Sequence, residues 1–486
     1  MTDAVRDLEL PSERRQMRRV YAILVALCCA LAAALVTAGP AQAAAQTITN
    51  GTQFTDTSGN PVHAHGGGVI KVGSYYYWFG EDRNADNTFK YVDAYRSTDL
   101  KNWEFRNHVL TQSSAAELGT AYIERPKVIY NASTGKFVMW MHKENGVDYS
   151  EAKAAVAVSS TVDGSYTYQG SFQPLGDNMS RDITTFVDTD GTAYMVSAAN
   201  ENYDLHIYRL TADYTAIASL VANPWAGGHR EAPALFKRNG VYFMLTSAAT
   251  GWSANQQQYA TATSIGGPWT AFTNVGDSTA YNSQTAYVLP VQGTSGTSYL
   301  YMGDRWGNSF GGTVNDSRYV WLPLTFPTTT SMSMASWYPE VSIDTAAGTI
   351  TGTSATYNTL VARNSAKCAD VANQSLWQGV AISQYTCNGG SNQKWWFKDL
   401  GTGYYELMGR GSSLCLQENA ANVTQENCTG ATAQQWSLTT SGSYVLVKAR
   451  ASGECLDVSG ASTANSAAII TYACSGATNQ QWTRGS

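Results

Sequence analysis

The sequence predicts an all-β protein made of a five-bladed β-propeller followed by a β-trefoil. One pattern recurs five times between residues 60 and 300: a polar residue, a short apolar run, a turn, and a Gly and an aromatic residue on a second apolar run. A shorter pattern recurs three times after residue 354, and each unit begins with Cys and ends in Gln-x-Trp. Fixed periods of this kind are typical of repeat architectures built from one small sheet per unit.

The five long repeats predict that one polar residue from each unit reaches a common pocket. They open at His65, Glu124, Asp182, Glu231 and Gln284, which are 59, 58, 49 and 53 residues apart. This period suits one four-stranded sheet per repeat. Because the first strand of every propeller blade lines the central axis, the five openers should converge there. Three carboxylates, an imidazole and an amide form a catalytic set rather than a hydrophobic core.

The N-terminus carries the pattern of a secretory signal. Arg14, Arg15, Arg18 and Arg19 precede an apolar run at residues 21–37, and small residues follow up to Ala43. This order predicts a signal peptide over 1–43 and a secreted, extracellular protein. The alternative, a membrane anchor, is disfavoured because the run is short for a span. We expect the propeller over 44–350 and the trefoil over 351–486.

Charge and composition narrow the choice of partners. After removal of the leader, 26 Lys and Arg face 33 Asp and Glu, which gives a net charge near −7. This balance argues against nucleic acid or anionic membranes as partners. Aromatic residues make up 12% of the chain and charged residues 14%. The surplus of aromatic rings suits stacking on neutral, hydroxyl-rich ligands. We expect a monomer.

The C-terminal repeats predict a disulfide-stabilised trefoil. Trp395, Trp436 and Trp482 are 41 and 46 residues apart, so each unit has room for about four short strands and the three indoles should meet inside. Six Cys residues lie in this region, and their proximity predicts the pairs Cys368–Cys387, Cys415–Cys428 and Cys455–Cys474. Zinc is the alternative, but the region has no C-x2-C pair and no His. We expect no metal and no cofactor.

The same repeats resemble the ricin-type lectins of carbohydrate-binding module family 13. The resemblance implies that a sugar sits on an aromatic ring near the second Cys of a repeat, held by the Asp of Cys-x-Asp and by an Asn beside Gln-x-Trp. The middle repeat has Gln417 and Glu426 in place of the Asp and the aromatic residue, so we expect that unit to be structural. The alternative for each Asp is a turn carboxylate that caps local amides. The implied sugar-binding residues are Asp370, Tyr385 and Asn392 in the first repeat and Asp457, Tyr472 and Asn479 in the third.

The acidic openers fit hydrolysis of a glycosidic bond, which requires two groups on opposite sides of the anomeric carbon. Glu231, in HREAPALF, is the strongest candidate for the proton donor, and Glu124 lies in the similar phrase ERPKVIY. Asp182 precedes an apolar run that ends at Asp188-Thr-Asp190-Gly191, a hairpin turn. The alternative for any one of them is a solvated carboxylate or one paired with a neighbouring Arg.

The phrases ERPKVIY, SRDITTFVDTDGTAY and HREAPALFKRNGVYF resemble those of family 43 glycoside hydrolases over residues 47–345. The resemblance implies that Glu231 is the general acid and that Asp182 tunes its pKa. The usual first-blade Asp base is missing, because that position reads His63-Ala64-His65.

Among family 43, the exo-β-1,3-galactanases resemble this chain in lacking that base. The resemblance implies that Glu124 binds hydroxyls of the terminal sugar and that Gln284 holds the attacking water, as a base or only as an orienting group. It also implies inversion, with about 6.5 to 9.5 Å between the acid and the group across the water. We also expect Glu81, His65 and Asn202 to bind substrate.

The predicted function is that of an exo-acting hydrolase that removes galactose from β-1,3-galactan main chains, such as those of arabinogalactan, with a trefoil that holds it to the substrate. An arabinofuranosidase or xylosidase of the same family is one alternative. A glycan-binding protein without catalysis is the other.

Overall fold

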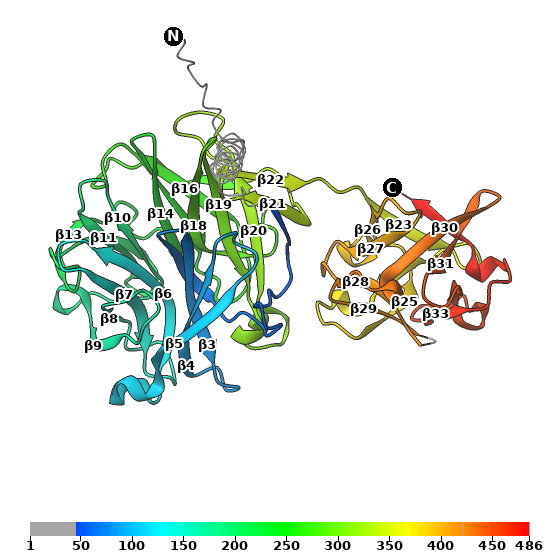
Figure 1. The fold of residues 1–486 in the computed structure, drawn as a ribbon, viewed down its shortest axis with the longest axis horizontal. Coiled ribbons are helices and arrows are strands. Elements are labelled where there is room, and N and C mark those ends of the chain that lie inside the picture. Colours follow the sequence, from blue (N-terminus) through cyan, green and yellow to red (C-terminus); the bar gives the residue numbers. More distant parts are fainter. Residues whose placement is uncertain (1–44, 421, 486) are drawn as a thin grey trace, which may run out of the picture. The chain divides into compact units, whose positions relative to one another are not determined.

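The computed structural model describes residues 45–420 and 422–485, and the predicted signal peptide lies outside these residues. In these ranges the chain forms β-strands joined by loops and short 3-10 helices (Figure 1). The all-β prediction is confirmed. None of the helices in the described residues is long and apolar enough to span a membrane.

Residues 65–324 form five antiparallel sheets, one for each long repeat. Each sheet contains consecutive strands that pair with their neighbours in sequence. The first two sheets comprise β2 (His65–Val72), β3 (Tyr75–Arg83), β4 (Phe89–Ser97), β5 (Glu104–Thr111), β6 (Tyr122–Asn131), β7 (Lys136–Glu144), β8 (Lys153–Ser159) and β9 (Thr167–Phe172). The next two comprise β10 (Ile183–Val187), β11 (Ala193–Ala199), β12 (Asp204–Leu210), β13 (Ile217–Ala222), β14 (Arg230–Arg238), β15 (Val241–Ala248), β16 (Gln257–Ala262) and β17 (Thr273–Val275). The fifth comprises β18 (Gln284–Gly293), β19 (Gly296–Arg305) and β20 (Arg318–Leu324).

The first strands of the five sheets contact one another in a closed order, β2 to β6, β10, β14, β18 and back to β2. This closure is the propeller arrangement that the period predicted. A tilted aromatic pair joins the first and last sheets, because Trp78 of β3 and Trp321 of β20 have ring centroids 5.0 Å apart and both are buried. The five openers therefore lie at, or within two residues of, the start of strands that face one axis.

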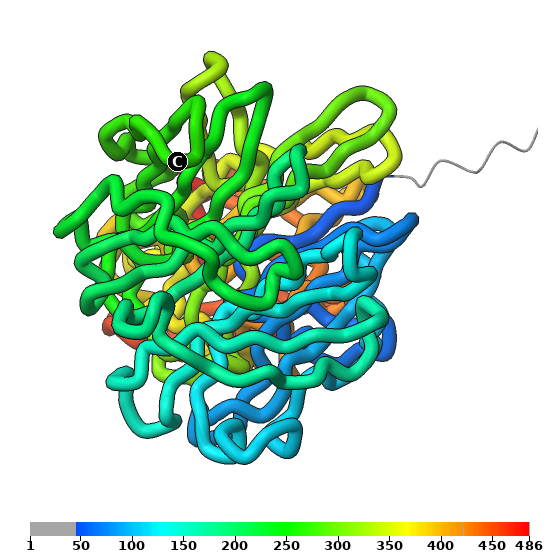
Figure 2. The backbone as a smooth tube through the Cα atoms, turned by 90° about the vertical axis from the view of Figure 1, so that its left-hand side faces the viewer, coloured from blue at the N-terminus to red at the C-terminus, as the bar shows by residue number. Residues whose placement is uncertain are grey.

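The fifth sheet has three strands, so the expectation of four strands in every repeat is wrong there. Residues 325–339 follow β20 and contain Pro327 and Pro339, which cannot donate to a β-ladder. The chain instead continues into β21 (Glu340–Asp344) and β22 (Thr349–Thr353). These two strands form a separate sheet with β1 (Gln46–Thr49), which Figure 2 shows in dark blue near the yellow-green part of the chain.

The C-terminal repeats form a trefoil of short strands around one core. Trp395, Trp436 and Trp482 are fully buried and belong to the same hydrophobic cluster, as predicted. The three predicted disulfides are confirmed. The strands are β23 (Tyr357–Ala362), β24 (Cys368–Val371), β25 (Val380–Tyr385), β26 (Trp395–Asp399), β27 (Tyr405–Gly409), β28 (Cys415–Asn419), β29 (Asn422–Glu426), β30 (Gln435–Ser441), β31 (Tyr444–Ala449), β32 (Cys455–Val458), β33 (Ile469–Tyr472) and β34 (Trp482–Gly485).

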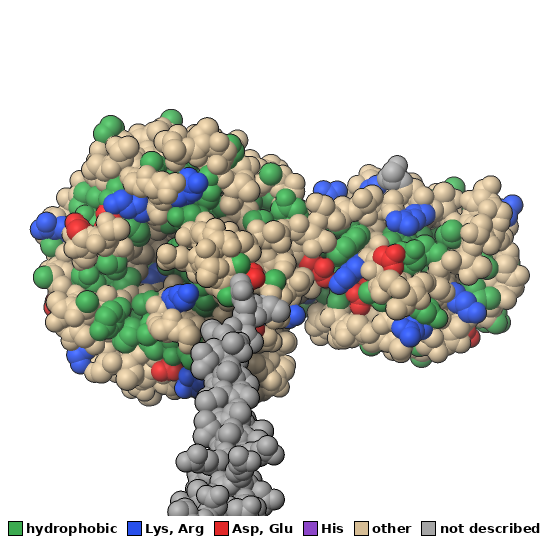
Figure 3. Space-filling view, turned by 45° about the horizontal axis from the view of Figure 1, so that its top comes forward, with side chains coloured by type: hydrophobic (Ala, Val, Ile, Leu, Met, Phe, Trp, Pro, Cys, Tyr) green, Lys and Arg blue, Asp and Glu red, His purple; other side chains and the backbone are tan. Residues whose placement is uncertain are grey.

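β22 is the last strand of the sheet that it forms with β1 and β21, and β23 is the first strand of the trefoil sheet. Basic side chains are scattered over the face shown in Figure 3. The 3-10 helices are η1 (Gln112–Ser114), η2 (Ala116–Leu118), η3 (Pro174–Gly176), η4 (Gly307–Phe310), η5 (Val314–Asp316), η6 (Ala372–Gln374), η7 (Ser391–Gln393), η8 (Thr432–Gln434), η9 (Ser459–Ala461) and η10 (Thr478–Gln480).

Candidate active site

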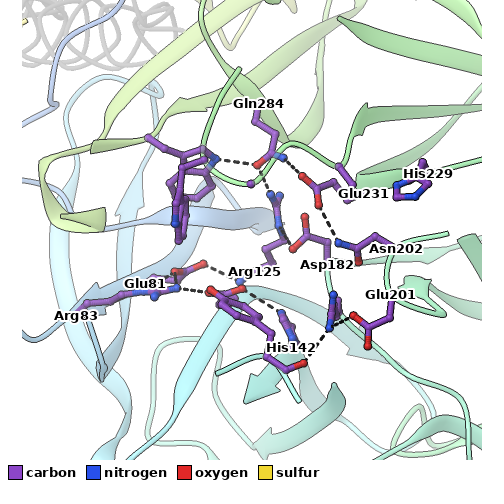
Figure 4. Close-up of a pocket in the computed structure, with 17 residues that line it drawn as sticks. Glu81, Arg83, Arg125, His142, Asp182, Glu201, Asn202, His229, Glu231 and Gln284 are labelled. Atoms are coloured by element: carbon purple, nitrogen blue, oxygen red, sulfur yellow. Dashed lines mark hydrogen bonds and ion pairs between the residues drawn. The ribbon is translucent and has the colours of Figure 1, made fainter. Parts of the chain in front are cut away.

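A cavity of about 400 Å³ lies where the first strands of the sheets begin. Glu124, Asp182, Glu231 and Gln284 all line it, although they are spread over 161 positions of the sequence, residues 124–284. Figure 4 shows Asp182, Glu231 and Gln284 pointing toward one another. The cavity also contains two of the expected substrate-binding residues, Glu81 and Asn202.

A β-bulge follows the opener in four of the five first strands and re-aims the residues around it. The register shifts after His65, Glu124, Glu231 and Thr285. Arg125 and Ala232, which follow Glu124 and Glu231, have left-handed φ values of 52° and 51°. Such conformations cost free energy in residues other than Gly and are concentrated at functional sites.

Glu231 is a carboxyl group of the cavity whose pKa is raised and to which no arginine is hydrogen-bonded. Its side chain is nearly buried, and burial together with the negative charge of Asp182 raises its pKa to about 8. Arg125 and Gln284 oppose this shift without cancelling it. Burial also raises the pKa of Glu81, although Arg83 opposes that shift. A carboxyl group that keeps its proton at neutral pH can act as a general acid.

Gln284 holds Glu231 directly. Its Nε2 donates to Glu231 Oε1 at 2.9 Å and to Ser247 Oγ at 2.9 Å, while its Oε1 accepts from Arg125 Nη2 at 2.6 Å and Trp306 Nε1 at 2.7 Å. The expected gap of about 6.5 to 9.5 Å between acid and amide is therefore wrong, since no water fits between atoms in direct contact. All four hydrogen-bonding positions of the amide are occupied, so Gln284 could hold a water only if one of these bonds opened.

Arg125 joins three of the first strands. Its Nε lies 2.9 Å from Asp182 Oδ1, and its Nη1 donates to the carbonyl of Thr285 at 2.9 Å. Asp182 Oδ2 accepts from the backbone N–H of Ala232 at 3.0 Å, beside Glu231. The pair therefore fixes the distance between the acid and the negative charge that raises its pKa.

Glu124 lies in a separate network on the β6 side of the cavity. Its Oε1 accepts from Arg83 Nη2 at 2.7 Å and from the hydroxyl of Tyr149 at 2.8 Å, and its Oε2 lies 3.1 Å from His142 Nδ1. Burial disfavours its charge, but Arg83 and His142 outweigh burial and lower the pKa of Glu124. Burial likewise opposes the charge of His142, yet Glu124 and Glu144 raise its pKa to about 9. Glu124 is therefore an ionised hydrogen-bond acceptor.

Glu81 lines the cavity, whereas His65 is buried away from it. Glu81 Oε2 accepts from Arg83 Nε at 3.0 Å, and its Oε1 accepts from the backbone N–H of Arg125 at 2.8 Å, so it lines the cavity and holds the β6 bulge. His65 is fully buried, lies 2.9 Å from Asp304 through Nδ1, and stacks on Tyr319. The expectation that His65 binds substrate is wrong, because it has no exposed surface and does not line the cavity.

Glu124, His142 and Asp182 are close enough together to share a metal ion, with ligand atoms within 4.8 Å of one another. Both carboxylates already face an arginine, and the second nitrogen of His142 lies 2.8 Å from Glu144 Oε1. A cation would have to displace these positive partners, so the residues do not fit a metal site.

Sequence reasoning missed the basic and aromatic side chains that surround the openers. Arg125 follows an opener directly, and this position in a repeated phrase was the only signal for it. Arg181 directly precedes the opener Asp182. The others come from later strands and loops, where the repeat carries no polar signature. They are Arg83, His142, Tyr149, Trp252 and Trp306.

In the trefoil, the first and third repeats share one polar arrangement. Asp370 Oδ2 accepts from Asn392 Nδ2 at 2.9 Å, and Asp457 Oδ2 accepts from Asn479 Nδ2 at 2.8 Å. Each Asp also accepts from the Gln of Gln-x-Trp, at 2.8 and 2.9 Å. Each Asp is therefore bound by side-chain amides rather than serving only as a turn cap.

Two tyrosines of the trefoil are exposed, unlike the tryptophans of its core. Tyr385 and Tyr472 are 41% and 61% exposed, and each lies between the Asp and the Asn of its repeat in sequence. In the middle repeat Gln417 Oε1 takes the place of the Asp and accepts from Gln434 Nε2 at 2.9 Å. The middle repeat thus lacks both the carboxylate and the exposed ring.

The comparisons with known proteins agree with this geometry. The family model of glycosyl hydrolases family 43 matches residues 59–308, and that of the ricin-type β-trefoil lectin domain matches residues 356–482. No curated protein matches the chain.

Solved structures of galactan-degrading enzymes match most of the chain. An exo-β-1,3-galactanase from Clostridium thermocellum is 47% identical, with 90% of this chain and 99% of that chain covered and a TM-score of 0.63. A variant of the exo-β-1,3-galactanase from Phanerochaete chrysosporium, with β-1,3-galactotriose, is 29% identical, with 88% and 100% covered and a TM-score of 0.63. A family 43 β-1,3-galactosidase with galactodeoxynojirimycin is 35% identical, with 60% and 99% covered and a TM-score of 0.54. The chain belongs to glycosyl hydrolases family 43 and is a glycosidase with a C-terminal ricin-type lectin domain.

Proposed function

We propose that this glycosidase is a secreted exo-acting enzyme that releases galactose from the ends of β-1,3-galactan main chains, such as those of arabinogalactan. The observation that carries the proposal is the state of Glu231. Among the carboxyl groups that line the cavity in the described residues, Glu231 alone is held by amides and by no arginine. It is therefore the carboxyl group best suited to donate a proton. The substrate class is supported by the three galactan-degrading enzymes that the chain resembles.

The remaining carboxylates favour direct attack by water. Glu124 and Asp182 each accept from an arginine and at least one further donor, and Glu81 is bound in the same way. Carboxylates so heavily hydrogen-bonded are weak nucleophiles, which disfavours a covalent glycosyl intermediate. We therefore propose a single displacement with inversion at the anomeric carbon.

In the proposed step, the bond between the anomeric carbon and the glycosidic oxygen breaks as Glu231 protonates that oxygen. The oxygen of one water bonds to the anomeric carbon and keeps one hydrogen, and the other proton returns to Glu231 through solvent. Asp182 favours the protonated acid between turnovers, and Arg125 holds Asp182 in place beside it. The paired Asp and Asn side chains of the first and third trefoil repeats are proposed to bind galactan and raise its local concentration.

Export is proposed from the basic and apolar order of residues 1–43 and from the three disulfides of the trefoil. Sequencing of the N-terminus of protein secreted by an expression host tests it, and the expected first residue is Ala44.

The substrate and the stereochemistry are tested together. Purified protein is assayed on β-1,3-galactan and on aryl arabinofuranoside and xyloside, and proton NMR follows the first galactose released. We expect galactose from the galactan alone, initially as the α-anomer. Release of arabinose or xylose would identify the alternative activities, and binding heat without release of sugar would identify a glycan-binding protein.

A further inference from the structure

The acid Glu231 is held by two amides, one on each oxygen (Figure 4). Gln284 Nε2 donates to Oε1 at 2.9 Å, and Asn202 Nδ2 donates to Oε2 at 3.1 Å. Both contacts suit the ionised carboxylate, which accepts hydrogen bonds only. A general acid must also exist as the carboxylic acid, and its proton then has to point at an acceptor.

Gln284 cannot supply that acceptor. Its oxygen already accepts from Arg125 Nη2 and Trp306 Nε1, which are groups that only donate. Turning the amide would bring its NH2 group against both donors. Oε1 of Glu231 therefore faces an N–H in either protonation state, and the acid proton is restricted to Oε2.

Asn202 has the freedom that Gln284 lacks. Its Oδ1 is buried without a hydrogen-bond partner, while its Nδ2 contacts Glu231. A half-turn of the amide exchanges the two atoms. Either orientation leaves one amide atom without a protein partner, so the two orientations differ mainly in what they offer to Glu231.

The loop that carries Asn202 is built to place this amide. Asn200, Glu201 and Asn202 connect β11 to β12 with left-handed φ values of 49°, 54° and 63°. Three consecutive non-glycine residues in this region are costly and persist only where their surroundings enforce them. Glu201 pairs with Arg181 and so anchors the loop at the rim of the cavity.

We propose that Asn202 is a positioning residue that turns its amide with the protonation state of Glu231. It donates through Nδ2 to the carboxylate and accepts through Oδ1 from the carboxylic acid, and it thereby holds the transferable proton on Oε2. The inference rests on the proposed role of Glu231 as general acid. When Glu231 gains its proton, the contact from Asn202 Nδ2 to the carboxylate is replaced by a contact from the Glu231 hydroxyl to Asn202 Oδ1. No other covalent bond changes until the proton is transferred to the substrate.

Charged groups reach Glu231 from three elements, and the test must separate their effects from that of Asn202. They are Asp182 before β10, Arg125 and Glu124 on β6, and Arg230 beside it on β14. None is altered in the variants below, so their contributions to the pH profile remain constant.

The test compares Asn202→Gly with the matched control Asn200→Gly. Glycine tolerates the left-handed conformation at both positions, so the two variants disturb the backbone alike, but only the first removes the contact with Glu231. On β-1,3-galactobiose we expect kcat to fall at least about tenfold in Asn202→Gly and to stay within about twofold in Asn200→Gly.

Asn202→Asp supplies a readout that a purely structural role would not give. A protonated Asp carries both a donor and an acceptor, whereas an ionised Asp only accepts. We expect its kcat to approach the wild-type value below about pH 4 and to fall to that of Asn202→Gly as the new carboxyl group ionises. Neutron diffraction below and above the pKa of Glu231 should show deuterium on Oε2 with Oδ1 facing it, and then Nδ2 facing Oε2.

The inference is overturned if Asn202→Gly keeps the wild-type kcat, if Asn202→Asp and Asn202→Gly share one pH profile, or if the deuteron lies on Oε1. These outcomes are distinct from failure of the proposed function, in which the unaltered protein releases no galactose.

Discussion

Replacing Asp182 by Asn removes the negative charge that helps to keep Glu231 protonated. The change keeps the size of the side chain, and the oxygen of Asn can still accept one of the two bonds from Arg125 and Ala232. Arg125 also loses its ion pair, so its positive charge becomes free to stabilise ionised Glu231. Both effects lower the pKa of the acid.

The size of the effect follows from the pKa of Glu231, which is raised from 4.5 to about 8 by burial and by Asp182. Loss of a nearby like charge moves a carboxyl pKa by about 1 to 3 units. A fall of about two units leaves roughly one molecule in ten protonated at pH 7, where about nine in ten are protonated in the unaltered protein. We therefore expect kcat/KM at pH 7 to fall about tenfold, or about 1.4 kcal/mol.

The assay is the pH dependence of kcat/KM on β-1,3-galactobiose. The basic limb should move down by about two units, with a much smaller loss at pH 5, where both proteins are mostly protonated. Asp188→Asn is the matched control, because Asp188 lies at the β10–β11 turn and bonds to Lys237 and Tyr242 outside the cavity. A basic limb that stays in place or moves to higher pH would refute this account of how the acid is tuned.

Three further predictions concern the acid, its scaffold and the trefoil. Glu231→Gln should abolish release of galactose, while calorimetry should still show binding of the substrate. The unfolding free energy of the unaltered protein should fall as pH rises from about 4.5 to about 8, because the raised pKa of Glu231 means that the folded state holds the proton more tightly than the unfolded state. Urea titration at several pH values should show a weaker dependence on pH in the variant. Arg125→Lys should lower kcat at least about tenfold, because a single ammonium cannot reach Asp182, Gln284 and Thr285 together, and unchanged kinetics would contradict this. Asp370→Ala combined with Asp457→Ala should remove retention on β-1,3-galactan in affinity electrophoresis without changing kcat on galactobiose, whereas Gln417→Ala should leave both unchanged; retention by the double variant would place the sugar sites elsewhere.

Much of the architecture could be predicted because each repeat of the sequence pattern corresponds to one structural unit of the same kind. The openers mark the beginnings of strands, and closure of the ring then brings Glu124, Asp182, Glu231 and Gln284 to one cavity. The Gln-x-Trp repeats likewise predicted the buried indoles, and short Cys spacings predicted the disulfides. The period of the sequence is informative because residues at the same place in each repeat have similar structural surroundings.

Features that depend on local backbone conformation could not be predicted in this way. His65 opens a repeat as Glu124 does, but it turns to Asp304 inside the core, and Glu81 from the neighbouring strand faces the cavity. The left-handed φ of Arg125 has no signal in a residue that is neither Gly nor Asn. The contact of Gln284 with Glu231 lies beside two further bulges, which the repeated pattern does not reveal.

The pairing of charges shows why sequence neighbours were a poor guide to this site. Each of Glu124, Asp182 and Glu231 has an arginine next to it in sequence, and neighbouring pairs are the simplest expectation. The arginines instead bond to groups that are distant in the sequence or on another strand. Arg125 reaches Asp182, Arg181 reaches Glu201, and Arg230 turns away to bond Thr246 through its Nε at 2.9 Å. Because Arg230 is committed to Thr246, Glu231 is hydrogen-bonded by amides alone, and burial together with the charge of Asp182 raises its pKa enough to retain the proton that hydrolysis requires.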